Sequence, residues 1–106
     1  MAAAAAAAAA ATSPEVQHEP GLFWLRMEGC EDLAVLEYEA LGNNVYDFKH
    51  TFAPECMRGK GVASRLATAA FNHASAHRWT VRPTCWFLRD VFLKQHPTFL
   101  RLVAKI

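Results

Sequence analysis

The chain has 106 residues, which is enough for one compact domain and too few for two of ordinary size. Its aromatic content and the absence of a repeat exclude a collagen, a coiled coil and a wholly disordered chain. The net charge of +1 conceals a division, since residues 1–40 carry seven acids and one base, whereas residues 41–106 carry three acids and ten bases. A basic half can bind an anionic ligand locally, although two solvated faces of different charge would give the same numbers.

The N-terminal segment contains an unbroken run of alanine over residues 2–11. We predict that residues 1–18 form a disordered extension before a domain at residues 19–106. The run lacks the charged region of a signal peptide and the arginines of a transit peptide. Three widely spaced cysteines without a C-x-x-C pair indicate a reducing compartment, with neither a disulfide framework nor a zinc site. These features predict a cytoplasmic or nuclear protein that does not enter a membrane.

Three strands are predicted first, because apolar residues alternate in segments that Gly and Asn separate; the segments are residues 22–27, 33–39 and 45–52. The spacing of two predicts that four side chains of the third strand share one face: Tyr46, Phe48, His50 and Phe52. The turn at residues 41–44 favours a tight hairpin, since Gly and Asn tolerate positive φ. These segments predict an antiparallel meander.

The second half alternates helices with a strand. Apolar and small residues at helical spacing predict a helix over residues 62–77. A strand over residues 79–87, a short helix over 89–95 and a closing helix or strand over 98–106 follow. The order β-β-β-α-β-α predicts a layered α+β domain, in which the meander continues into a parallel pair of strands beside the long helix.

The segment between the third strand and the long helix carries the most informative motif, Arg58-Gly59-Lys60-Gly61. Gly59 and Gly61 lack Cβ atoms, so backbone amides can approach an anion closely. The first turn of a helix leaves N–H groups without partners, and Arg58 and Lys60 add positive charge. We predict a pyrophosphate-binding loop, with an ordinary structural loop as the alternative. The P-loop and dinucleotide-binding patterns are absent.

Extended to Arg58-Gly59-Lys60-Gly61-Val62-Ala63, this motif matches the Q/R-x-x-G-x-G/A acyl-CoA motif, and the chain resembles the GNAT superfamily of N-acetyltransferases. Residues 21–106 look like its minimal single-domain branch. The resemblance implies two parallel strands that separate to admit the pantetheine arm of CoA, with Thr84-Cys85-Trp86 on the second strand. It also implies that the amides of residues 60–64 hold the pyrophosphate and that the backbone of residues 51–53 pairs with the pantetheine. The implied cofactor-binding residues are Thr51, Phe52, Ala53, Arg58, Gly59, Lys60, Gly61, Val62, Ala63 and Ser64.

Acetyl transfer to an amine requires a neutral nucleophile, and deprotonating a lysine at pH 7 costs about 4.6 kcal/mol without assistance. His50 is the candidate base, since imidazole titrates near neutral pH, but a histidine buried in the core is an equal alternative. Glu37 and Glu39 are further candidates that would act through water. Cys85 is a candidate for an acetyl-cysteine intermediate, with inert packing as the alternative.

The predicted long helix and the segments after it contain further histidines, arginines and aromatic residues. His73 and His77 have the i, i+4 spacing of two metal ligands, but no glutamate follows the first and no third ligand is spaced suitably, so a pair on the helix surface is predicted and no metal. Four arginines are candidate partners of the CoA 3′-phosphate: Arg65, Arg78, Arg82 and Arg89. Four aromatic residues are expected in the core or beside the cofactor: Trp79, Trp86, Phe87 and Phe92.

The leading hypothesis is an acetyl-CoA-dependent N-acetyltransferase that acts on a small amine, a polyamine or a protein lysine or N-terminus. Direct attack by the amine, with His50 as base, is the expected mechanism. The alternative is a non-catalytic module that binds CoA or a protein. A nucleic-acid-binding module is a third hypothesis, disfavoured because no known motif supports it. The expected partners are CoA and an amine acceptor, and a weak homodimer is a further hypothesis.

Overall fold

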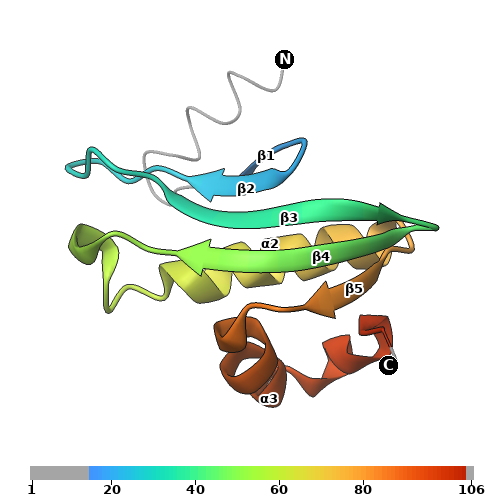
Figure 1. The fold of residues 1–106 in the computed structure, drawn as a ribbon. Coiled ribbons are helices and arrows are strands. Elements are labelled where there is room, and N and C mark those ends of the chain that lie inside the picture. The colour runs from blue at the N-terminus through green and yellow to red at the C-terminus, as the bar shows by residue number, and fades with distance from the viewer. Residues whose placement is uncertain (1–14, 105–106) are drawn as a thin grey trace.

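The computed structural model describes residues 15–104, which form a five-stranded sheet with helices packed against one face (Figure 1). The strands are β1 (Gln17–Glu19), β2 (Leu22–Leu25), β3 (Ala34–Gly42), β4 (Val45–Phe52) and β5 (Thr80–Pro83). The helices are the 3-10 helix η1 (Glu55–Met57), the long helix α2 (Val62–Ala76), the π-helix η2 (Phe87–Phe92), α3 (Leu93–Gln95) and the 3-10 helix η3 (Pro97–Leu102). Within residues 15–104, no helix is long and apolar enough to cross a membrane.

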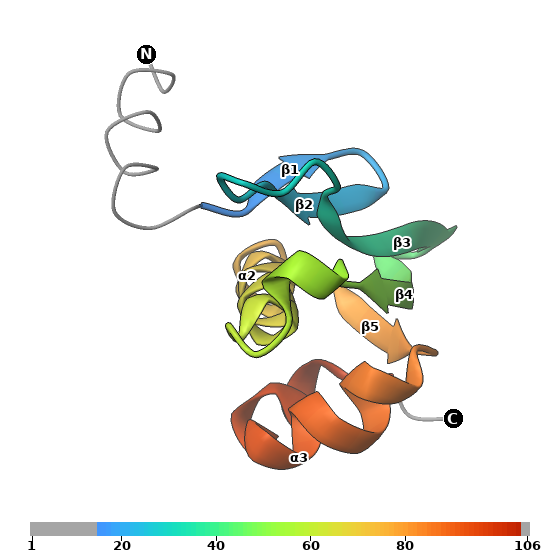
Figure 2. The ribbon, with the colours of Figure 1, turned by 90° about the vertical axis from the view of Figure 1, so that its left-hand side faces the viewer.

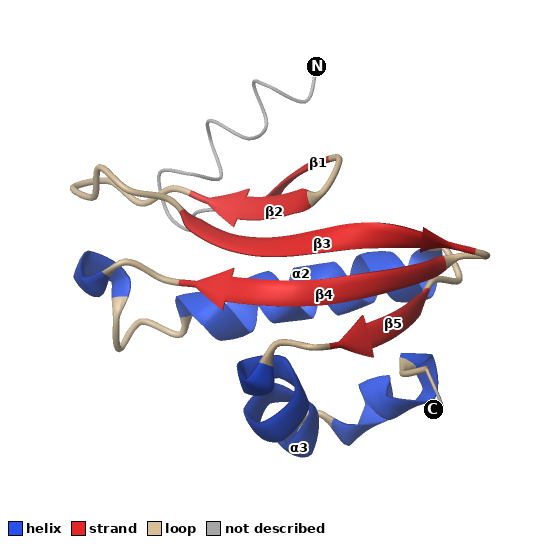
Figure 3. Cartoon of the chain, in the orientation of Figure 1, coloured by secondary structure: helices blue, strands red, loops and turns tan. Residues whose placement is uncertain are grey.

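The strands lie in the order β1-β2-β3-β4-β5, and neighbouring strands are antiparallel except β4 and β5, which run parallel (Figure 3). This arrangement confirms the predicted α+β fold, in which a meander continues into a parallel pair. Asn43 and Asn44 form the turn between β3 and β4 with φ angles of 56° and 63°. Asparagine tolerates this left-handed conformation, which a type I′ hairpin requires at both positions.

Strand β1 lies partly in the segment predicted to be a disordered extension. His18 pairs with Phe23 of β2, so the sheet begins before the predicted domain boundary at residue 19. The ring of His18 stacks on that of Phe23 with centroids 4.3 Å apart, and its Nε2 lies 2.6 Å from the Tyr38 hydroxyl. Contacts with residues distant in the sequence therefore hold β1 in place. Residues 1–14 of the predicted extension lie outside the described residues.

Helix α2 covers the inner face of the sheet with its predicted apolar stripe. Ala70 and Ala74 are fully buried on this stripe, and their small side chains let the helix lie close to the strands. Phe48 of β4 contacts Phe71 of the helix, with ring centroids 5.3 Å apart. Figure 2 shows α2 on one side of β3 and β4, with no described helix on their other side. The helix predicted over residues 62–77 is confirmed to within one residue.

Strand β5 is shorter than the strand predicted over residues 79–87. Pro83 has no N–H to donate, and the amide of Thr84 turns back to a β5 carbonyl at 3.0 Å, so regular pairing ends there. Cys85 and Trp86 therefore lie beyond the strand, contrary to the placement that the family resemblance implied. The chain bends at this point and enters η2.

The C-terminal part of the described chain is mainly helical. The short helix predicted over residues 89–95 belongs to a longer run, η2 and α3, that begins at Phe87. The segment predicted from residue 98 onward as a helix or a strand forms η3, and Val103 then bridges Val81 of β5 in parallel. Residues 105–106 lie outside the described residues.

A β-bulge in β4 changes which of its side chains share a face. His50 pairs with Glu37 of β3 and Phe48 pairs with Tyr38, so Lys49 is an extra residue without a partner. The alternation of faces is reversed beyond the bulge, which leaves Phe48 fully buried and His50 exposed on the opposite face. The prediction that the even-numbered residues of β4 share one face is therefore wrong beyond Phe48.

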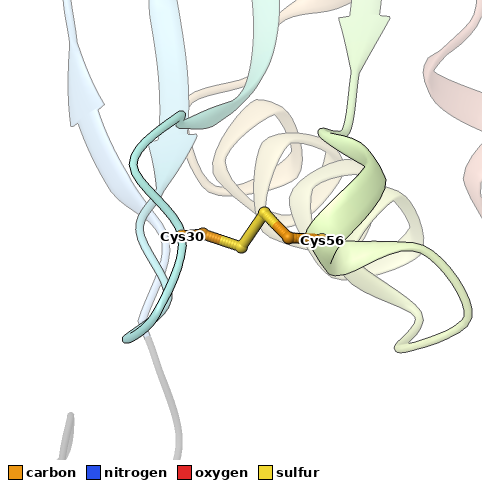
Figure 4. The surroundings of a disulfide bond; sticks show 2 residues. All are labelled: Cys30 and Cys56. Atoms are coloured by element: carbon orange, nitrogen blue, oxygen red, sulfur yellow. A yellow bond between two sulfur atoms is a disulfide. The ribbon is translucent and has the colours of Figure 1, made fainter.

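A disulfide bond joins Cys30, in the loop between β2 and β3, to Cys56 of η1 (Figure 4). Their Cα atoms lie 6.1 Å apart, although the two residues are 26 positions apart in the sequence. The prediction of no disulfide is therefore wrong, because spacing along the chain does not show which loops the fold brings together. The cysteine pattern consequently gives no support to a reducing compartment. Cys85 is the free cysteine, and it is buried.

The Cys56→Ser variant is expected to lower the free energy of unfolding by about 3 kcal/mol, because the bond restricts the unfolded chain. Urea unfolding with and without dithiothreitol measures this effect. Reductant should lower the midpoint for the wild-type protein and leave the variant unchanged. A wild-type midpoint that is the same in both conditions would contradict a stabilising disulfide.

Three histidines pack together between β1 and the end of α2. His73 stacks on His77 with ring centroids 4.0 Å apart, and His18 lies 4.5 Å from His73. Partial burial lowers the pKa of His18 and His73, and the nearby charge of His77 lowers both further. His77 is exposed as predicted, whereas His73 is half-buried. Within residues 15–104, no group of three or more potential ligands is arranged to hold a metal ion.

Stability is expected to fall as the solution is acidified from about pH 7.5 to about pH 5. His18 and His73 have lowered pKa values in the folded state. At pH values below 6.5, the ordinary pKa of histidine, the unfolded chain therefore binds more protons than the folded protein. The stabilising contribution of these two histidines is therefore complete above pH 6.5 and is lost as the pH falls below it. Calorimetric melting temperatures should show a shallower pH dependence in the His18→Gln/His73→Gln variant. An identical dependence in both proteins would refute this assignment.

Candidate functional site

The parallel strands β4 and β5 separate part of the way along β4. Their register ends where Phe48 lies opposite Pro83, and the amide of Cys85 then donates to the carbonyl of Phe48 at 3.1 Å. Strand β4 continues to Phe52, so its last four residues have no neighbouring strand on the β5 side. Backbone groups at such an edge are available to water or to a ligand.

A cleft of about 710 Å³ opens at this separation. Its lining residues come from β4, the loop after it, α2 and the segment after β5: Lys49, His50, Thr51, Ala53, Arg58, Ala63, Thr84, Cys85, Trp86 and Phe87. The fold therefore brings both predicted catalytic residues, His50 and Cys85, into one cleft. Four of the predicted cofactor-binding residues line it with them: Thr51, Ala53, Arg58 and Ala63.

The glycine loop before α2 leaves the first turn of the helix open. Gly59 and Gly61 have φ angles of 79° and 70°, a left-handed conformation that favours glycine. No side chain caps the helix, so the amides of Val62, Ala63 and Ser64 keep the free N–H groups and the partial positive charge of a helix N-terminus. A Cβ added at Gly61 would meet no atom within 4 Å, which shows that a ligand has room there.

The amide of Lys60 departs from the predicted set of anion-binding amides. It donates to the carbonyl of Met57 at 3.3 Å, and the amide of Arg58 donates to Glu55 at 3.1 Å. The turn that follows η1 thus uses both amides internally. The predicted set therefore loses the amide of Lys60 and keeps the amides of Gly61 and of the first turn of α2. Lys60 is exposed and can contribute the charge of its side chain.

The cleft has a positive lining. Lys49 and Arg58 line it, and no carboxylate does. Lys49 also forms an ion pair with Glu39 at 3.6 Å, whereas Arg58 has no such pair within residues 15–104. The arrangement favours an anionic ligand at the Arg58 end of the cleft, beside the first turn of α2.

The four arginines considered as partners of a 3′-phosphate do not line this cleft: Arg65, Arg78, Arg82 and Arg89. Arg65 borders a separate groove of about 410 Å³ along α2. Arg89 forms an ion pair with Asp90 at 3.1 Å, and their hydrogen bonds raise the pKa of Arg89 and lower that of Asp90. Arg58 is therefore the arginine that the structure brings to the site.

His50 lies on the exposed face of β4 and lines the cleft. Its interpretation as a core histidine is wrong, because the bulge at Lys49 turns its side chain away from the core. Glu37 lies opposite His50 on β3, but neither Glu37 nor Glu39 lines the cleft. Among the lining residues, His50 carries the type of side chain that accepts a proton near neutral pH.

Cys85 lies in the wall of the cleft and is 9% exposed. Its Sγ donates a hydrogen bond to the Thr51 hydroxyl at 3.5 Å, which links the segment after β5 to β4. A second link lies beside it, where Thr84 Oγ1 donates to Asp47 at 2.5 Å. The thiol therefore has a neutral hydroxyl as its partner rather than a base.

Sequence reasoning missed Lys49 as a lining residue, and it gave Thr84 no role of its own although the family resemblance placed the Thr84-Cys85-Trp86 segment beside the pantetheine arm. Lys49 reaches the cleft through the bulge, which no local pattern marks, and Thr84 reaches it because β5 ends early. Trp86 and Phe87 are found beside the cleft, one of the two places expected for them, and Trp86 is 64% exposed. The side chain of Phe52 does not line the cleft, which leaves its backbone as the part that can serve the predicted cofactor role.

Comparison with known proteins agrees with this geometry. A family model described as GCN5-related N-acetyl-transferase matches residues 23–102. Over 75 residues, the chain is 39% identical to Protein NATD1 of Bos taurus and 37% identical to Protein NATD1 of Homo sapiens. Each match covers 71% of this chain and 66% of the relative, so the chain spans slightly less than two thirds of their length.

Among solved structures, the solution structure of a GCN5-like protein from Staphylococcus aureus has a similar fold. The TM-score is 0.67 at 21% sequence identity, and the match covers 87% of this chain and 89% of the other. At this identity the likeness concerns the fold alone. The family model, in contrast, spans most of the chain, including the elements from β3 to η3 and every lining residue of the cleft. The protein belongs to the GCN5-related N-acetyltransferases.

Proposed function

We propose that this domain transfers an acetyl group from acetyl-CoA to an amine. The observation that carries the proposal is the single cleft in which Arg58, the first turn of α2 at Ala63 and His50 meet. A cation and free helix amides suit the diphosphate of CoA. An exposed imidazole suits the removal of a proton from the amine.

The residues present fit CoA at two further points. The free edge of β4 offers unpaired backbone groups to an extended arm that contains amides, as the pantetheine arm does. The space above Gly61 lets a bulky anion reach the first-turn amides of α2. We therefore assign pantetheine pairing to the backbone of Thr51, Phe52 and Ala53, and pyrophosphate binding to the loop and the first turn of α2, with charge from Arg58 and Lys60.

When bound, acetyl-CoA supplies a thioester carbonyl that is activated toward an amine. His50 accepts the proton that the amine must lose, because its imidazole lies in the cleft and faces solvent. Unpaired amides of the β4 edge would serve as hydrogen-bond donors to the thioester oxygen. In that transfer the bond between the acyl carbon and the CoA sulfur would break and CoA would leave as its thiolate. His50 would release the proton of the amine to solvent, which its exposed position allows, and the thiolate would take up a proton from solvent.

Direct attack by the amine is favoured over a route through Cys85. A nucleophilic thiol requires a neighbouring base or cation that stabilises the thiolate. The hydrogen-bond partner of Cys85 is the Thr51 hydroxyl, and His50 lies on the opposite face of β4 from the core. Arg89 is close enough to interact electrostatically with Cys85, but its guanidinium is paired with Asp90. In this arrangement Cys85 packs in the wall of the cleft.

A non-catalytic module that binds CoA or a protein is the second candidate function. The surroundings of His50 favour this second candidate. No other residue in the range 15–104 forms a hydrogen bond to its imidazole, so nothing in that range orients the ring as a catalytic base. Such a module would retain the cofactor loop and lack transfer to any amine. The predicted weak homodimer has no support in the described part of the chain.

The Gly61→Ala variant is expected to weaken CoA binding by about tenfold or more, because the new Cβ occupies the space beside the helix amides. Isothermal titration with CoA measures the dissociation constant. The left-handed φ of 70° also makes alanine strained at this position, so a control must carry the same strain.

Gly42→Ala provides that control. Gly42 has a φ of 98° in the hairpin between β3 and β4, and its added Cβ would likewise meet no atom within 4 Å. Both variants should lose similar stability, but Gly42→Ala should bind CoA as the wild-type protein does. Equal CoA affinity in the two variants would exclude the proposed pyrophosphate site.

The His50→Gln variant is expected to lower kcat by about 100-fold, the lower limit of what a general base contributes, without changing CoA affinity. Release of CoA thiol in the presence of an amine measures kcat. Cys85→Ala is the matched variant in the same cleft and should retain transfer. Loss of transfer in Cys85→Ala, together with an acetyl adduct on the wild-type thiol, would instead establish the acyl-cysteine route.

A further inference from the structure

The face of β3 and β4 that points away from α2 is uncovered in the described residues. In Figure 1, α2 passes behind both strands, and Figure 2 shows the same face from the side without a helix against it. His50 lies on this face and also lines the cleft. An acceptor that approaches His50 can therefore lie across the open sheet.

An apolar row crosses this face beside His50. Trp24 of β2 pairs with Val35 of β3, and Val35 pairs with Phe52 of β4, so the three side chains lie side by side on one face. Phe52 is 46% exposed, although aromatic side chains of this size are usually covered. Together the three residues, here named the apolar row, form a surface suited to a bulky apolar group.

A carboxylate without a partner lies next to the apolar row. Glu37 is exposed, pairs in register with His50, and has no hydrogen bond or ion pair with any other residue between 15 and 104. The other three carboxylates of this face each have a partner: Glu19 bonds Trp24, Glu39 pairs with Lys49, and Asp47 accepts from Thr84. Glu37 is thus free to attract the ammonium group of an incoming acceptor.

The distance between the apolar row and the pair of Glu37 and His50 indicates the kind of acceptor that fits this face. Along β4, Phe52 and His50 are two residues apart on one face, as are Val35 and Glu37 along β3, which corresponds to about 7 Å. Side chains at positions i and i+2 of an extended peptide also point to one side and are about 7 Å apart. An extended peptide therefore matches the sheet face in the distance between its side chains. It also matches in chemistry, since an amine suits Glu37 and an apolar side chain suits the apolar row.

We propose, on the basis of the acetyltransferase function above, that the acceptor is an extended polypeptide segment lying on the open sheet face. Its reactive amine lies at Glu37 and His50, and a bulky apolar side chain two residues away lies on the apolar row. A polyamine lacks a branched apolar group to cover Phe52, and a small amine cannot reach both features. The proposal assigns acceptor recognition to Glu37, Val35, Trp24 and Phe52.

The test compares short blocked peptides that contain one lysine and differ at one other position. One pair carries leucine or serine two residues after the lysine, a second pair carries them two residues before it, and a third peptide has leucine directly beside the lysine. Release of CoA thiol gives kcat/KM. Leucine at one of the two-residue spacings should raise kcat/KM by about tenfold over serine. The adjacent leucine should give no gain.

Two variants separate the contributions of the two features. Phe52→Ala should reduce the leucine-to-serine ratio toward one, and this ratio cancels any change in cofactor binding because both peptides meet the same enzyme. Glu37→Gln should raise KM several-fold for both peptides and leave the ratio unchanged. The controls are Leu100→Ala, an apolar residue that is 53% exposed on η3, and Glu31→Gln, in the loop before β3. Both should behave as the wild-type protein.

The outcomes distinguish this inference from the function on which it rests. If CoA binds and spermidine and all peptides react equally well, the polypeptide acceptor is wrong and the acetyltransferase function stands. CoA binding without transfer to any of these acceptors also overturns the inference. If CoA does not bind, the proposed function itself fails.

Discussion

The site depends on the early end of one strand. Strand β5 stops at Pro83, which has no amide hydrogen to continue the ladder, while β4 extends four residues further. The bonds from Cys85 to Phe48 and from Thr84 to Asp47 hold the two chains together immediately before they part. Backbone groups of β4 that a longer β5 would otherwise satisfy are thereby left at the wall of a cleft. An anionic ligand with an extended amide arm can use both the edge and the helix start beside it.

The distribution of apolar side chains explains why the sheet has one face covered by helices and one open face in the described residues. Helix α2 packs on β2 and β3 at the inner face, and η2 and η3 contact α2 in turn. Phe48, Phe71 and Phe92 are fully buried in this region. A domain of this size buries a limited share of its surface and cannot build a second core. The disulfide between Cys30 and Cys56 adds a covalent constraint and anchors η1, which leads directly into Arg58 and the glycine loop. The glycine loop is thus supported from both ends, by η1 and by α2.

The bulge at Lys49 determines which face of β4 carries His50. Without the extra residue, His50 would follow Phe48 into the core, where a histidine serves packing rather than proton transfer. With it, His50 faces the cleft and the open face, and Thr51 takes the inward position next to Cys85. One inserted residue therefore determines which side chain can meet an acceptor.

The sequence alone predicted the meander, the Asn43-Asn44 turn, the long helix and the glycine loop before it. Each of these depends on local periodicity or on the conformational preference of a few neighbouring residues, which the sequence contains in full. The resemblance to the family motif added the proposal that the ligand is CoA. The tertiary structure decided the face of His50, the end of β5, the engaged amide of Lys60 and the disulfide of Cys30 with Cys56. These features depend on strand register and on contacts between distant segments, and such contacts exist once the chain has folded and have no local signature.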